Sequence, residues 1–324
     1  MSLKGTDNAP SPLLKWRDTM ETVKPIIPRV GALEKKKRRQ GMLLVLPAVL
    51  ILLCISGYAL GWAFVMSFSD NKAVMGNSFL FVGLENYVSV LTASSFSSAI
   101  INTLRYCVCT IGIELALGLL TAAKLSKNAP GSKIASLAIT TPMMISSVAA
   151  ASCWLWMFSD GYGIINYFLN CFGIEGPLWL TYATPARWAI VIVSVWGAAP
   201  FSILLLYAAE TGISPDLFEA ARIDGASEFQ TYWKVVFPQL RITIVMILMV
   251  RVMDSVKMYD IPHVLTGGGP ANATQFISEY IYRRSFDSYK FGESAAGSYI
   301  ITVFIVMVSL LINRLNKEDD GLVS

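Results

Sequence analysis

Apolar runs long enough to cross a lipid bilayer as helices recur along this chain. Each is near or above the length of about 20 residues that a transmembrane helix needs. The alternation of lipid-facing and lumen-facing residues that is typical of membrane barrels is absent. The sequence therefore predicts an all-α fold, a polytopic membrane helical bundle of about six transmembrane helices. The runs lie near Met42–Phe68, Ser97–Ala123, Ile134–Phe158, Trp188–Ala209, Ile242–Val264 and Ala295–Ile312.

Composition supports the same class. Hydrophobic residues make up 54% of the 324 positions and charged residues only 15%, whereas about a quarter of the residues in a soluble domain are charged. The first 40 residues are polar and lack the apolar stretch of a cleavable signal peptide, so the first run is interpreted as an uncleaved anchor. The expected division is an N-terminal tail over 1–40, a transmembrane domain over 41–316 and a C-terminal tail over 317–324.

Basic residues near the ends of the runs predict the orientation, because loops rich in Lys and Arg stay on the cytoplasmic side. Positions 35–39, just before the first run, are all basic. Lys124, Lys127 and Lys133 surround the connection after the second run, which has no acidic residue. Both termini and the connection after the fourth run are therefore expected in the cytoplasm. The basic residues within 283–290, in a predicted outer loop, depart from the rule locally.

The connection after the fourth run carries the signals of two short helices joined by a turn. Ser214 followed by Pro215 indicates a helix start, because Ser caps free backbone amides and Pro has a helical φ at the first position. Gly225 suits the left-handed conformation just past a helix end. Ser227 and Gln230 have the spacing of a capping box that starts the second helix. The pattern predicts a helix-turn-helix that docks another protein, and the alternative is an ordinary cytoplasmic connector.

These residues resemble the coupling motif of binding-protein-dependent ABC importer permeases, and the resemblance covers roughly residues 40–316. The motif consists of Glu219-Ala220-Ala221, then Asp224-Gly225-Ala226, then Pro238, which is expected to end the second helix. Three more stretches resemble the carbohydrate-uptake, maltose-permease-like branch of this family. They are Phe81-Val82-Gly83-Leu84-Glu85-Asn86-Tyr87, Asp160-Gly161-Tyr162-Gly163-Ile164-Ile165-Asn166 and Leu265-Thr266-Gly267-Gly268-Gly269-Pro270.

The resemblance implies a transporter subunit, not an enzyme, in the inner (plasma) membrane of the cell. It implies as partners a second permease subunit, two ATPase subunits, an external solute-binding protein, a sugar or polyol ligand and the lipid bilayer, and no nucleic acid. The chain has no Walker motif, so no cofactor is expected in it, and ATP and Mg are expected in the partner subunits. The ATPase-coupling residues are expected to be Glu219, as the polar anchor, with Ala220, Ala221, Asp224, Gly225, Ala226 and Pro238.

The fifth apolar run contains charged residues, which are costly in a bilayer and usually face a bundle interior or an aqueous cavity. Arg251, Asp254 and Ser255 recur at helical spacing and share one face, where Arg251 can pair with Asp254. The alternative to a solute pathway is a structural ion pair or a contact with a partner helix. By resemblance to maltose permeases, the substrate pathway is expected at Ala198, Phe201, Arg251, Asp254, Ser255 and Asp260.

The sequence leaves the solute open. A polyol, a glycerol phosphate or a polar nonsugar could replace a sugar. An ion-coupled secondary carrier would use Asp254 and Asp260 to bind protons or sodium, but it leaves the organised connection after the fourth run unexplained. The chain has a single histidine and no cluster of metal ligands, which disfavours a metal site or a membrane-embedded hydrolase. Three tryptophans are candidate rings for covering a sugar, or anchors at the membrane interface: Trp154, Trp156 and Trp196.

Overall fold

The structure is a computed structural model that describes residues 30–70, 80–126 and 132–320. Over these ranges the secondary structure is helical, apart from one isolated bridge between Ser69 and Phe81. The chain divides into two compact units, Met1–Trp62 and Ala63–Ser324. Residues 1–29 of the predicted N-terminal tail, residues 321–324 of the predicted C-terminal tail, and Lys127 lie outside the described residues.

In the first unit, helix α2 (Val30–Leu52) leads through a π-helical turn, η1 (Leu53–Gly57), into α3 (Tyr58–Ser67), which continues into the second unit. The segment Gln40–Ser67 is long and apolar enough to cross a membrane, in agreement with the first predicted run. Helix α2 also includes the basic positions 35–39. The helix therefore begins before the apolar segment.

The second unit contains the remaining helices, with a group of short ones between the fourth and fifth predicted runs. In chain order they are α4 (Glu85–Thr92), α5 (Ser94–Leu125), α6 (Ser132–Thr140), η3 (Thr141–Met144), α7 (Ser147–Met157), α8 (Ile164–Cys171), α9 (Ala183–Thr211), α10 (Pro215–Ile223), α11 (Glu228–Thr231), η4 (Tyr232–Val236), α12 (Phe237–Gln239), α13 (Arg241–Lys257), α14 (Asp260–Thr266), α15 (Ile277–Phe286) and α16 (Phe291–Asp320).

Among the described residues, four helical segments are long and apolar enough to cross a membrane, or six if two bent pairs each count as one span. The predicted all-α membrane bundle is confirmed. The third predicted run is not one straight helix, because its two halves meet at 98°. Pro142 lacks a backbone N–H and Ile145 is extended, which ends the first half. The fifth predicted run is also broken, between Lys257 of α13 and Asp260 of α14.

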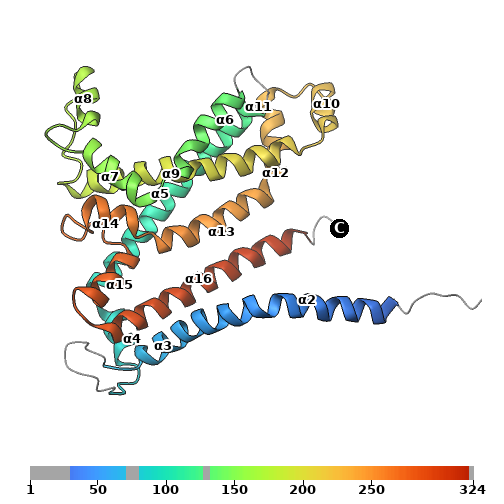
Figure 1. Ribbon diagram of the computed structural model, residues 1–324. Coiled ribbons are helices and arrows are strands. Elements are labelled where there is room, and N and C mark those ends of the chain that lie inside the picture. The colour runs from blue at the N-terminus through green and yellow to red at the C-terminus, as the bar shows by residue number, and fades with distance from the viewer. Residues whose placement is uncertain (1–29, 71–79, 127–131, 321–324) are drawn as a thin grey trace, which may run out of the picture. The chain divides into compact units, whose positions relative to one another are not determined.

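Helices α5 and α9 form the central packed pair of the second unit (Figure 1). At Gly118 they approach so closely that a β-carbon there would lie 2.8 Å from Leu206 Cδ1. Helix α13 packs on α5 and α9, and α16 packs on α13. Ile190, Leu206 and Ile247 are buried in the apolar clusters of this unit. This packing fixes the membrane helices that flank the predicted docking connection.

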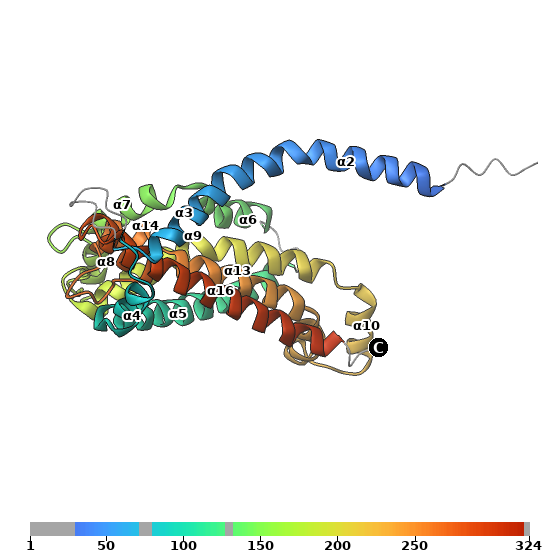
Figure 2. The ribbon, with the colours of Figure 1, turned by 90° about the horizontal axis from the view of Figure 1, so that it is seen from below.

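The second unit has two distinct ends. Figures 1 and 2 show α10 at one end and α7, α8 and α14 at the opposite end. At the latter end, Asn102 Nδ2 donates to Asn272 O at 3.0 Å, which fastens the turn after α14 to α5. Asn86 of α4 donates to the carbonyl oxygens of Ser67 and Ser69, each at 2.9 Å. Polar side chains thus fix the chain segments at this end.

Candidate functional site

Residues 214–240 connect α9 to α13, and we term them the coupling segment. Ser214 caps α10, since its Oγ accepts a hydrogen bond from the backbone N–H of Asp216 at 3.4 Å. Ser227 Oγ accepts from Gln230 N at 3.3 Å, and Gln230 Oε1 accepts from Ser227 N at 2.9 Å. These reciprocal bonds are a capping box. Both predicted helix starts are confirmed.

The turn between the two short helices is a Schellman motif. The backbone N–H of Gly225 donates to Arg222 O at 3.1 Å, and that of Ala226 donates to Ala221 O at 2.9 Å, which is the pair of bonds that defines this motif. Gly225 has a φ of +73°, a conformation that glycine adopts without steric cost. The predicted end of the first helix and the left-handed glycine after it are confirmed.

The second helix ends at Gln239, one residue after Pro238, and the following helix α13 is turned by 63° from it. Helix α11 continues through the π-helical turn η4 into α12, which contains Pro238 in its first turn. Proline lacks the backbone N–H that the helical hydrogen-bond pattern needs, which agrees with a helix end at this position. The second helix of the coupling segment therefore ends within one residue of the position that the sequence predicted.

The coupling segment presents both polar and apolar side chains to its surroundings. Glu219, Ala220, Asp224, Gly225 and Pro238 are exposed, Ala226 is half-buried, and Ala221 is buried. Two large apolar side chains stand out, because Ile223 is 86% exposed and Phe229 is 73% exposed. Trp233 contacts Phe229 edge to face, with ring centroids 6.2 Å apart. An exposed apolar patch rimmed by polar groups is typical of a protein interaction site.

The inner side of the coupling segment is fastened to the membrane helices. Phe218 of α10 and Tyr232 of η4 pack on an apolar cluster that includes Leu206 of α9. The Tyr232 hydroxyl lies 3.3 Å from Leu119 O on α5 and 3.2 Å from Glu210 Oε1 on α9. A displacement of the coupling segment would therefore be transmitted to both central helices.

A second arrangement of functional interest lies inside the bundle, where a bidentate ion pair joins α5 to α13. Arg251 donates from Nε to Glu114 Oε2 at 2.7 Å and from Nη2 to Glu114 Oε1 at 2.8 Å. The side chains of Arg251 and Glu114 are 8% and 0% exposed. Arg251 Nη1 also donates to Asp254 Oδ2 at 3.2 Å, as predicted from the helical spacing. Paired charges of opposite sign are the form in which ionisable groups are tolerated in membrane bundles.

The other predicted pathway residues are only partly brought to this cluster. Ser255 is buried on the adjacent turn of α13. Asp260, on α14, accepts a hydrogen bond from Ser147 Oγ of α7 at 2.6 Å. Ala198 and Phe201 are half-buried residues of α9. Among the described residues, the hydrogen bonds and ion pairs do not join Asp260, Ala198 or Phe201 to the ion-pair cluster.

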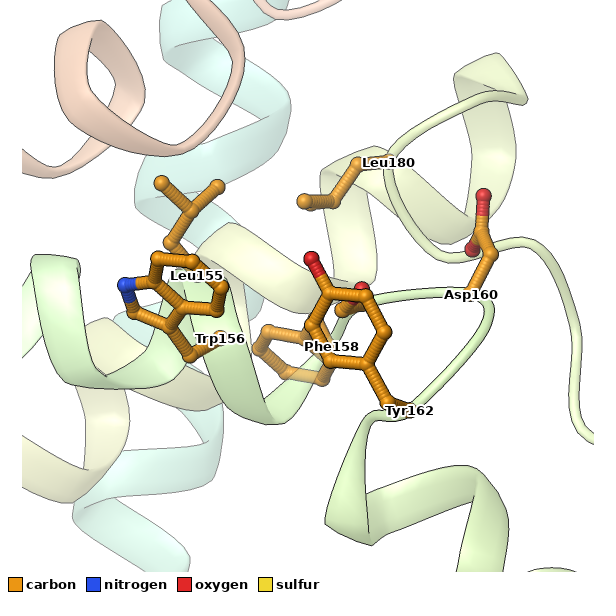
Figure 3. Close-up of a pocket in the computed structure, with 7 residues that line it drawn as sticks. Leu155, Trp156, Phe158, Asp160, Tyr162 and Leu180 are labelled. Atoms are coloured by element: carbon orange, nitrogen blue, oxygen red, sulfur yellow. The ribbon is translucent and has the colours of Figure 1, made fainter.

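A pocket of about 280 Å³ lies at the end of α7 (Figure 3). Trp156 and Tyr162 contact each other there, with ring centroids 5.9 Å apart. Asp160 Oδ2, also at the pocket, accepts a hydrogen bond from Thr181 at 3.0 Å. The pocket contains none of the predicted pathway residues. In the described part of the chain, no group of three or more His, Cys, Asp or Glu side chains is arranged to hold a metal ion.

Residues 114–317 match the family described as the inner membrane component of binding-protein-dependent transport systems. The matched range includes the whole coupling segment and both partners of the buried ion pair. The chain belongs to this family. It is a permease of an ABC importer, a transporter subunit whose ATPase is a separate subunit.

Known proteins extend the comparison over most of the permease. It is 32% identical over 281 residues to the trehalose/maltose transport system permease protein MalF of Thermococcus litoralis, covering 86% of this chain and 94% of that protein. It is 29% identical to the trehalose transport system permease protein SugA of Mycobacterium tuberculosis, with 91% and 94% covered. A chain of the same fold occurs in the crystal structure of a bacterial alginate ABC transporter in complex with an alginate pentasaccharide-bound periplasmic protein. The two chains superimpose with a TM-score of 0.76 at 22% sequence identity. The match covers 88% of this permease and 96% of that chain.

Sequence reasoning missed Glu114, although it lies in the second predicted run. The available signal was a carboxylate in an otherwise apolar run, which implies a buried partner or an aqueous cavity. The predicted partner of Arg251 was Asp254 alone. In the structure Arg251 also contacts Glu114, and this contact is the stronger one. Glu114 accepts two hydrogen bonds from Arg251, whereas Asp254 accepts one.

Proposed function

We propose that this permease imports a sugar or a related polyhydroxyl solute that an external solute-binding protein delivers. The observation that carries the proposal is the coupling segment, a capped and turned pair of helices with exposed apolar side chains between two membrane spans. Its relatives include permeases for trehalose and maltose, which supports the carbohydrate class. The transmembrane domain would span residues 41–316.

The coupling segment would dock into a groove of an ATPase subunit. Glu219 and Asp224 would form polar contacts at the rim of the interface, while Ile223 and Phe229 would fill apolar positions of the groove. Ala220 is small and exposed, so it would allow close approach of the partner backbone. ATP and Mg would be held by two such ATPase subunits, whose closure would move the coupling segment and, through Tyr232, the central helices α5 and α9.

This permease would pair with a second permease subunit to form the solute pathway. Its coupling segment and both termini would face the cytoplasm, because the basic residues of the sequence gather on that side. The opposite end, with α7, α8 and α14, would receive the solute-binding protein near residues 81–87 and 266–272. Within the bilayer, Ala198, Phe201, Arg251, Asp254, Ser255 and Asp260 would mark the pathway side of the chain.

The first test is co-purification of the detergent-solubilised permease with its partners, followed by an ATPase assay with sugar-loaded binding protein. We expect recovery of an ATPase and a second permease, and stimulation of ATP hydrolysis by the loaded binding protein. Glu219→Lys should reduce ATPase recovery, because it reverses the charge of an exposed side chain in the interface. Glu175→Lys is a matched control, since Glu175 is exposed and follows α8 in the chain, and α8 lies at the opposite end from α10 (Figure 1).

Two outcomes would refute the proposal. A permease that purifies alone and moves solute in liposomes under an ion gradient would be a secondary carrier, with Asp254 and Asp260 as its ion-binding candidates. Equal loss of ATPase recovery in Glu219→Lys and Glu175→Lys would show a general folding defect and would remove the evidence for docking at the coupling segment.

A further inference from the structure

The buried ion pair determines which charged group of the cluster is available to a solute. Arg251 is bonded at all three of its guanidinium nitrogens, by Nε and Nη2 to Glu114 and by Nη1 to Asp254. Bidentate binding of a phosphate or a carboxylate by Arg251 requires two N–H groups on one free edge of its guanidinium. Glu114 already occupies the edge formed by Nε and Nη2. Nη1 is bonded to Asp254 and the Arg251 side chain is only 8% exposed. The guanidinium is therefore held as a structural cation and is not presented to an anionic solute.

Asp254 is the accessible member of the cluster. Its side chain is 49% exposed, compared with 8% for Arg251. Its Oδ2 accepts the bond from Arg251, and among the described residues Oδ1 receives no hydrogen bond. An ionised carboxylate only accepts hydrogen bonds, so Oδ1 is suited to a hydroxyl donor. The same charge repels an anion.

The charged groups near Asp254 do not reverse the negative charge at this position. Glu114, Arg251 and Asp254 together carry a formal charge of −1, since one cation faces two carboxylates. Lys257 is exposed at the end of α13, and Asp260 begins α14 with its Oδ2 bonded to Ser147. These last two charges cancel, which leaves −1 for the five groups.

We propose that Asp254 makes the permease select uncharged polyhydroxyl solutes over anionic ones such as sugar phosphates, and that Glu114 is the positioning residue that keeps Arg251 from binding an anion. The inference rests on the proposed function, because it requires that the solute passes Asp254. It narrows the solute classes that the sequence leaves open: neutral sugars and polyols fit this cluster, and a glycerol phosphate does not.

The test uses the complete importer in nanodiscs, without the binding protein, so that the permease alone sets the preference. Isothermal titration is performed with two matched pairs, trehalose with trehalose 6-phosphate and glycerol with sn-glycerol 3-phosphate. The wild type should bind each neutral member about tenfold or more tightly than its phosphate. Asp254→Asn should reduce that ratio by about tenfold, because it removes the negative charge that repels the phosphate and keeps a polar side chain of the same size. Lys257→Gln, a matched change one turn away, should not reduce it.

Glu114→Gln provides an independent readout. This variant frees the Arg251 guanidinium from a carboxylate, so the affinity for the phosphates should rise relative to the affinity for the neutral solutes. Glu114→Asp keeps the carboxylate and should restore the wild-type ratio of the two affinities. A purely structural role for Glu114 would weaken both members of a pair equally. Co-purification of all subunits verifies that each variant assembles, and Asp254→Asn tests the inference without disturbing the buried pair.

Three results would overturn the inference: equal affinity of the wild type for the two members of a pair, an unchanged ratio in Asp254→Asn, or no binding of either pair to the wild type. The last would mean that the cluster does not face the solute. The proposed function would survive all three if loaded binding protein still stimulates ATP hydrolysis. Absence of that stimulation would refute the proposed function itself.

Discussion

At the residue scale, the contact between Glu114 and Arg251 predicts an asymmetric response to mutation. Removing one partner of a buried pair leaves an uncompensated charge and costs about 3–5 kcal/mol, whereas replacing both partners by apolar residues is often neutral. We expect Glu114→Met and Arg251→Met each to lower the unfolding temperature, and the double variant to recover most of the loss. Thermal unfolding of the detergent-purified permease measures this. A double variant no more stable than either single variant would contradict the pairing.

Gly225 gives a second prediction at the residue scale. A β-branched residue at its φ of +73° is strained, at a cost of roughly 1–2 kcal/mol. Gly225→Val should therefore misdirect α11 and reduce ATPase stimulation, whereas Gly225→Asn, which tolerates this conformation, should retain more of it. Gly173→Val is the matched control, because Gly173 has a φ of +72° beyond α8. Equal stimulation in Gly225→Val and the wild type would show that the turn does not matter for coupling.

Residues whose structure depends on nearby sequence were predictable. The Schellman turn at Gly225 and the capping box at Ser227 follow from groups within a few positions of each other, and so does the contact of Arg251 with Asp254. Glu114 lies 137 positions from Arg251, so its pairing depends on how α5 packs against α13. No local pattern contains that information.

At the element scale, Tyr232 connects the coupling segment to the membrane helices. Tyr232→Phe keeps the ring in its apolar cluster but removes the hydroxyl that lies near Leu119 O and Glu210 Oε1. Removing a hydrogen-bond partner of a buried group costs about 1–3 kcal/mol. We expect ATPase recovery to remain and solute transported per ATP to fall, as measured in proteoliposomes.

Tyr167→Phe provides the matched control for this prediction, since Tyr167 is an exposed residue of α8. The same transport per ATP in Tyr232→Phe as in Tyr167→Phe would contradict a mechanical role for the hydroxyl. Loss of the ATPase from the Tyr232→Phe complex would instead place Tyr232 in docking rather than in transmission.

The number of membrane-crossing segments was predicted from the sequence, but the bends within them were not. The apolar runs indicated where the chain enters the membrane, but the 98° bend between α6 with η3 and α7 was not predicted. Apolar composition is the same on both sides of such a break, and Pro142 alone does not separate a kink from the end of a helix. At Pro238 the local signal was sufficient, because the helix ends at Gln239 and α13 is turned by 63° from it.

At the scale of the whole molecule, the second unit separates its candidate functions spatially. The coupling segment occupies one end, and the opposite end holds α7, α8, α14 and the asparagine contacts that fix its chain segments (Figure 1). The ion-pair cluster on α5 and α13 belongs to the helices between them. In the proposed function, this separation gives the ATPase subunit and the solute-binding protein different ends of the permease, with the proposed solute-facing Asp254 between them.

The orientation of these ends is the last prediction. In a background without the five native cysteines, Tyr162→Cys and Ile223→Cys introduce thiols at exposed positions at opposite ends, where the native side chains are 74% and 86% exposed. A membrane-impermeant maleimide applied to spheroplasts should label Tyr162→Cys directly and Ile223→Cys only after the membrane is opened. Labelling of both after opening shows that each thiol is reactive. The reverse pattern would place the coupling segment outside the cell, where no ATPase subunit could reach it.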